Sequence, residues 1–151
     1  ATSYLALIRS NLEYSASVWD PHFKGDIKHL GSIQRRAARF VLNQRREDHS
    51  SITAALLHLQ WQTLEERRKH QRLAMLFKMV NSLVVVPVKD YLNFATRKTR
   101  VDNSMKFTQI HTRTDAYKYS FFRRTVCDWN KLSELTVTSK TVDSFKSRLL
   151  K

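Results

Sequence analysis

The chain has one cysteine, two glycines and two prolines among its 151 residues, and these scarcities exclude several kinds of site. Because Cys127 has no second cysteine to pair with, an intrachain disulfide and a zinc cluster built from cysteines are excluded. We interpret Cys127 as a small buried hydrophobic side chain in a reducing, intracellular setting. Two glycines are too few for the glycine-rich loops that cradle phosphates.

The sequence also lacks a long apolar run. The longest, Leu83–Val86 followed by Pro87 and Val88, is far shorter than the roughly 20 residues that a membrane-spanning helix needs. No signal peptide is visible, and we expect no membrane partner. The chain starts at Ala1 and enters a helical pattern at once, so we expect it to be a piece of a longer protein.

Acidic residues are few. The chain has 13 Asp and Glu against 27 Lys and Arg, a formal net charge of +14, and such an excess favours association with polyanions. The excess is uneven, with a net charge of +3 over residues 1–60 and +11 over residues 61–151. We therefore expect the anion-binding surface mostly in the second part of the chain.

Catalytic patterns are missing as well. No two carboxylates share an apolar frame that would raise a pKa for acid–base work. The six histidines form no HExxH motif or other ligand spacing, and no serine lies in a nucleophile elbow. The sequence thus predicts no active site, no metal site, no cofactor and no small-molecule substrate. We expect that this chain alone is not an enzyme.

What the chain does contain is apolar residues at helical spacing, which predict a mostly α fold. We expect one domain of five to seven helices, with a long irregular basic connection over residues 95–112 that holds a short strand at 106–110. The predicted helices span residues 2–17, 26–43, 51–57, 63–83, 120–132 and 141–150.

Local signals fix several helix ends and faces. Thr63 and Glu66 fit a capping box, Ser120 is expected to cap the helix over 120–132, and Thr141 or Ser139 the last helix. The helix over 26–43 is the most clearly amphipathic. Its predicted inward stripe is Ile27, Leu30, Ile33, Ala37, Phe40 and Val41.

The stretch from Arg113 to Leu132 interleaves aromatic and basic side chains. One interpretation is a buried aromatic helix with a solvated basic face, on which Phe122, Val126 and Trp129 point inward. The other is an edge where phosphates meet cations and unpaired bases stack on rings such as Tyr117, Tyr119 and Phe121. The sequence leaves both open.

A second basic group crowds the first turns of the helix over 63–83. Positive charge there opposes the helix dipole, so we interpret the group as evidence for an anionic ligand rather than for stability. The predicted nucleic-acid-binding residues are Arg35, Arg36, Arg39, Arg67, Arg68, Arg72, Arg97, Lys98, Arg100, Arg113, Tyr117, Lys118, Tyr119, Arg123 and Arg124.

Several phrases follow one another over nearly the whole chain: Leu12-Glu13-Tyr14-Ser15-Ala16-Ser17-Val18-Trp19-Asp20-Pro21; Ile33-Gln34-Arg35-Arg36-Ala37-Ala38-Arg39-Phe40; Trp61 with Leu64-Glu65-Glu66-Arg67-Arg68; and Arg113-Thr114-Asp115-Ala116-Tyr117-Lys118-Tyr119-Ser120-Phe121-Phe122 with Trp129-Asn130-x-Leu132 and Phe145-Lys146. In this order they resemble the region downstream of the palm, the thumb and C-terminal region, of jockey-like non-LTR retrotransposon reverse transcriptases.

The resemblance implies a parent RNA-directed DNA polymerase that uses magnesium and works in nucleus and cytoplasm. The family's aromatic-x-Asp-Asp signature does not occur here, so no catalytic carboxylate is carried over. Two roles stay open for the chain. It is either a nucleic-acid-binding module that holds template RNA or the RNA–DNA hybrid, or a structural, protein-interaction module that packs on the upstream polymerase domain at its thumb.

Overall fold

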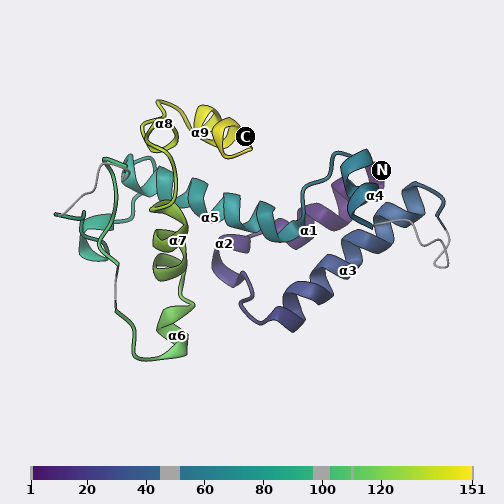
Figure 1. The fold of residues 1–151 in the computed structure, drawn as a ribbon, viewed down its shortest axis with the longest axis horizontal. Coiled ribbons are helices and arrows are strands. Elements are labelled where there is room, and N and C mark those ends of the chain that lie inside the picture. The colour runs from purple at the N-terminus through teal and green to yellow at the C-terminus, as the bar shows by residue number, and fades with distance from the viewer. Residues whose placement is uncertain (1, 45–51, 97–102, 110, 151) are drawn as a thin grey trace. The chain divides into compact units, whose positions relative to one another are not determined.

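The computed structural model describes residues 2–44, 52–96, 103–109 and 111–150, and this part of the chain is mostly α-helical, as the sequence predicts (Figure 1). The backbone groups into two compact units, Ala1–Lys69 and His70–Lys151. Their boundary falls within helix α5 (Leu64–Val80), and each unit is described by itself. The prediction of a single domain stays a prediction.

The first unit contains a π-helix, η1 (Tyr4–Arg9), followed by α1 (Ser10–Glu13), α2 (Ala16–Trp19), α3 (Lys24–Val41), α4 (Ile52–His58) and the start of α5. The second contains the rest of α5, the 3-10 turn η2 (Val88–Asp90), α6 (Asp115–Lys118), α7 (Phe121–Trp129), α8 (Glu134–Val137) and α9 (Val142–Leu149).

The helix predicted over residues 2–17 is instead divided into η1, α1 and α2. Ser10 donates a hydrogen bond to the Ala6 carbonyl, and the Asn11 amide donates to the Leu7 carbonyl at 2.6 Å. Such side-chain bonds compete with the helical backbone bonds. The helix then breaks at Ser15, whose φ of 49° is left-handed.

The first unit buries apolar side chains together with the polar Gln34 and the charged Arg68. Ala16, Ala38 and Leu64 are buried, and the Tyr4 ring stacks on Trp61 with centroids 4.7 Å apart. Gln34 is also buried, and its amide donates to the Gln62 carbonyl at 2.8 Å and accepts from the Leu64 N–H at 3.2 Å. This side chain therefore satisfies backbone groups at the start of α5.

The inward stripe predicted for α3 is wrong at Phe40, which is 88% exposed. Gln34 and Ala38 are the residues of α3 that are buried, so the buried face lies to one side of the predicted one. The hydrophobic periodicity predicts a different face because it takes the polar Gln34 as exposed and the aromatic Phe40 as buried.

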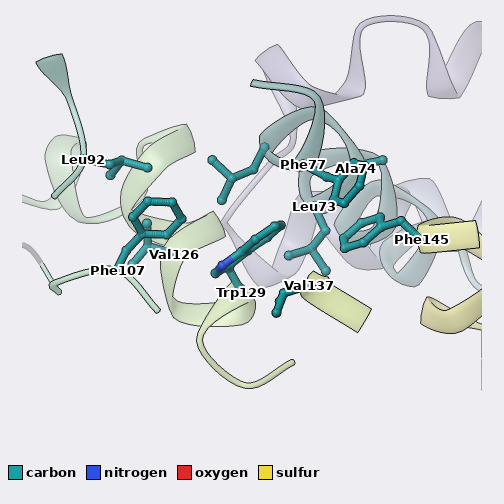
Figure 2. Packing of buried hydrophobic residues seen from close by; sticks show 10 residues of the cluster. Leu73, Ala74, Phe77, Leu92, Phe107, Val126, Trp129, Val137 and Phe145 are labelled. Atoms are coloured by element: carbon teal, nitrogen blue, oxygen red, sulfur yellow. The ribbon is translucent and has the colours of Figure 1, made fainter. Parts of the chain in front are cut away.

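The second unit is built around a series of aromatic rings (Figure 2). The ring centroids lie 4.8 Å apart for Phe94 and Phe107 and 6.1 Å apart for Phe107 and Trp129. They lie 5.8 Å apart for Trp129 and Phe145 and 4.4 Å apart for Phe145 and Phe77. Trp129 and Phe145 are fully buried, and Phe122 packs against the cluster at its margin. The inward side of α7 that the sequence predicts, Phe122, Val126 and Trp129, is thus confirmed.

The segment before α6 is held by the end of α7. The Asn130 amide accepts from the Phe107 N–H at 3.0 Å and donates to its carbonyl at 2.8 Å, while the Trp129 indole donates to the Met105 carbonyl at 2.9 Å. Over residues 106–109 the strand predicted at 106–110 is reduced to a single antiparallel bridge between Phe94 and Phe107, and Ile110 lies outside the described residues. Trp129 and Asn130 therefore hold that segment against the end of α7 by hydrogen bonds.

Two predicted caps are confirmed and one is wrong. Thr63 Oγ1 accepts from the Glu66 N–H, and Glu66 accepts from the Thr63 N–H, each at 3.2 Å, which is a capping box. Thr141 accepts from the Ser144 N–H at 3.1 Å. Ser120 precedes α7, but its hydroxyl donates backwards to the Tyr117 carbonyl at 2.7 Å instead of capping the helix.

No helix in the described ranges combines the length and the hydropathy needed to cross a bilayer.

Candidate nucleic-acid interface

Two of the predicted binding arginines lie in ion pairs within the first unit. Arg68 Nε is 2.8 Å from Asp20 Oδ1, and the side chains are only 1% and 8% exposed. Arg67 contacts Glu13 with two guanidinium nitrogens, one of them at 2.8 Å. The hydrogen bond to Glu13 raises the pKa of Arg67 above its ordinary value. Glu13 also lies 3.8 Å from Arg9, so it balances two cations.

Arg72 belongs to the second unit, where its Nη2 lies 3.3 Å from Asp128 Oδ2 on α7. It is buried, with 7% of the side chain exposed. The inference that stability does not explain the cations at the start of α5 is therefore wrong for Arg67, Arg68 and Arg72. Internal carboxylates offset the unfavourable dipole, and a buried arginine such as Arg68 cannot reach a phosphate without local unfolding.

The arginines of α3 lie on a surface that remains open. Arg36 is exposed, Arg39 is half-buried, and Arg35 donates to the Lys28 carbonyl at 3.1 Å. Neither Arg36 nor Arg39 makes an ion pair with any residue in the described ranges. Together with Phe40 and Gln44 they line a hollow of about 380 Å³ at the end of the helix.

A second basic surface surrounds α6. Arg113 and Lys118 are exposed, and Tyr117 has 49% of its surface exposed. The Lys118 Nζ lies 5.2 Å from the centroid of the Tyr119 ring, a cation–π contact. Asp115 is the only acid from residue 103 to residue 127. The α6 surface, defined here as Arg113, Tyr117, Lys118 and Tyr119, therefore combines exposed cations with one exposed ring, that of Tyr117.

The basic residues of α7 lie partly inside the unit. Arg123 and Arg124 are half-buried, and Arg123 donates a hydrogen bond to Sγ of Cys127. Cys127 is itself half-buried rather than buried. Phe121 packs edge-on against Phe122, with centroids 5.3 Å apart, so its ring is already engaged within the unit.

The predicted residues thus fall into four groups. Arg35, Arg36 and Arg39 lie on α3, and the α6 surface is followed along the chain by the half-buried Arg123 and Arg124 of α7. Arg67, Arg68 and Arg72 form internal ion pairs. Arg97, Lys98 and Arg100 lie outside the described residues.

Sequence reasoning missed Phe40 and Gln44 as members of the α3 hollow, because Phe40 had been assigned to the core stripe. The adjacency of an aromatic to Arg36 and Arg39 was the available signal.

No group of three or more His, Cys, Asp or Glu side chains placed to hold one metal ion occurs in residues 2–44, 52–96, 103–109 and 111–150. Comparison of the chain with protein-family models, with curated proteins and with solved structures finds no match.

Proposed function

We propose that this chain is a non-catalytic nucleic-acid-binding segment of a non-LTR retrotransposon reverse transcriptase and that it holds template RNA or the RNA–DNA hybrid. The observation that carries the proposal is the α6 surface, in which exposed cations and tyrosine rings lie together. The assignment to a reverse transcriptase rests on the sequence resemblance alone.

The composition of the surface favours a nucleic acid over a generic anion. Arg113 and Lys118 supply charge for the phosphate backbone, whose contacts dominate affinity and make it salt-dependent. Tyr117 supplies a ring whose face can stack on an unpaired base, worth about 1–3 kcal/mol per base. A surface that serves solubility needs the cations but not the exposed tyrosine.

The proposal is tested by fluorescence anisotropy with a single-stranded RNA, a hairpin RNA and an RNA–DNA hybrid, between about 50 and 200 mM salt. We expect tight binding that weakens steeply as salt rises. The ranking of the three ligands distinguishes template from hybrid. A folded chain that binds none of them at low salt refutes the proposal.

The double variant Arg113→Gln/Lys118→Gln tests the surface itself. It should weaken binding to a single strand. It should also make the slope of log affinity against log salt concentration less steep by about 1.4, since each lost phosphate contact removes about 0.7 from that slope. The matched control is Lys140→Gln/Lys146→Gln, which removes the same charge from two exposed positions, one on α9 and one just before it. Equal losses in both variants would mean that only net charge matters.

A second candidate function, a module that packs on the polymerase thumb, is favoured by apolar side chains exposed on the first unit. Leu7, Tyr14, Val18 and Phe23 have 67%, 78%, 86% and 65% of their surfaces exposed. A face that a protein partner covers in the assembled polymerase would leave such apolar side chains exposed in the isolated chain. It predicts that the isolated chain self-associates in analytical ultracentrifugation and that adding the upstream polymerase region restores a single species. A monodisperse chain that melts cooperatively by itself would argue against it.

A further inference from the structure

We infer that the α3 hollow, lined by Arg36, Arg39, Phe40 and Gln44, is a subsite for one unpaired nucleotide of a single strand, with its base stacked on Phe40. This inference rests on the proposed function and deepens it, because it names a part of the nucleic acid that the chain recognises. The α6 surface belongs to the other unit, so each surface is tested by its own variants.

The exposure of Phe40 is the first step of the argument. A phenyl ring that is 88% exposed gains almost nothing from the core, and it lies one helical turn after Arg36 and next to Arg39. On a helix, residues four apart share a face. The Phe40 ring and the Arg36 guanidinium can therefore contact the same ligand.

The charge around the hollow is the second step. From Ile27 to Gln44 the sequence contains four basic residues and no acid. Cations near a helix C-terminus are favourable by themselves, which accounts for part of this pattern. The dipole does not account for an exposed aromatic among them, whereas a nucleotide, with an anionic phosphate and a flat base, matches both features.

The size of the hollow is the third step. Its volume is about 380 Å³, and it is open to solvent rather than enclosed, as a site for one base of a longer strand must be. The Gln44 side chain adds an amide donor and acceptor at its edge. A paired base offers no free face to Phe40, so the subsite favours an unpaired nucleotide over a duplex.

The test measures binding of the full chain to a single-stranded RNA, to the same sequence as DNA, and to an abasic strand of equal length. Phe40→Ala should weaken binding to both base-bearing strands by roughly five- to 150-fold and leave the abasic strand unchanged, since stacking is lost and phosphate contacts are kept. Phe40→Trp should retain or tighten binding. Arg36→Gln/Arg39→Gln should weaken binding to all three strands.

Phe23→Ala is the matched control, because it removes another exposed ring at the opposite end of α3. It should leave all three affinities unchanged. Full affinity of Phe40→Ala for RNA, with loss only in the α6-surface variant, overturns this inference and leaves the proposed function standing. A wild-type chain that binds no strand overturns both. If Phe40 binds a protein and its replacement leaves RNA binding unchanged, the nucleotide subsite is also rejected.

Discussion

Arg67 and Arg68 are adjacent arginines that form similar ion pairs, and they differ in burial. Arg68 and Asp20 are 1% and 8% exposed, whereas Arg67 has 30% of its side chain exposed and Glu13 has 11%. Breaking a buried pair by removing one partner costs about 3–5 kcal/mol, because the remaining charge stays buried and loses its ion-pair partner. Solvent-exposed pairs contribute at most about 1 kcal/mol.

We therefore expect Arg68→Ala to lower the free energy of unfolding by about 3–5 kcal/mol and Arg67→Ala by about 1–3 kcal/mol, because the Arg67–Glu13 pair is partly exposed and Glu13 keeps Arg9 as a partner. A folded unit of 69 residues has roughly 3–10 kcal/mol in total, so the first change removes much of the stability of the first unit. The assay is urea unfolding followed by far-UV circular dichroism, with Trp19 and Trp61 fluorescence reporting on this unit.

The double variant Asp20→Ala/Arg68→Met separates stability from binding. It removes both charges, so it should regain most of the lost stability. It should also bind RNA like the wild-type chain, because Arg68 is not available to a phosphate. A stable Arg68→Ala variant that loses RNA affinity would refute the reasoning and return Arg68 to the binding surface.

Three further predictions concern local contacts. Asn130→Ala should cost about 1–3 kcal/mol by leaving the Phe107 N–H and carbonyl without their partner; an unchanged urea midpoint would contradict this. Thr63→Ala should cost about 0.5–2 kcal/mol by opening the capping box at α5, measured by thermal unfolding, and Thr63→Ser should recover most of it. Burial raises the pKa of Tyr4 above the ordinary value of 10.0, partly offset by Arg9, so the unfolded state releases this proton first. The contribution of Tyr4 to the free energy of unfolding should be fully present below pH 10 and should be lost as pH rises through the folded-state pKa of this side chain. Tyr4→Phe should remove that part of the pH dependence.

The elements with strong local signals were predictable. The long helices and the capping box at Thr63 follow from periodicity and from the pairing of two short-range side chains. The inward residues of α7 were also predictable, because Val126 and Trp129 recur at helical spacing, and both are fully buried.

The rest depends on contacts between residues far apart in sequence. Arg68 is indistinguishable from Arg67 in the sequence, and only the position of Asp20 makes it a buried side chain. Gln34 is buried because the start of α5 offers it a carbonyl and an N–H, which no periodicity reveals. The same missing information placed Phe40 in the core and hid the α3 hollow.

The series of rings from Phe94 through Phe107, Trp129 and Phe145 to Phe77 has a consequence for how the protein is made. Because the rings come from segments widely separated along the chain, the core cannot close on a ribosome until the residues through Phe145 have emerged. A translation product that stops before α9 leaves Phe77 without its stacking partner Phe145 and leaves Trp129 with Phe107 alone. Such a product exposes apolar surface and is prone to aggregate.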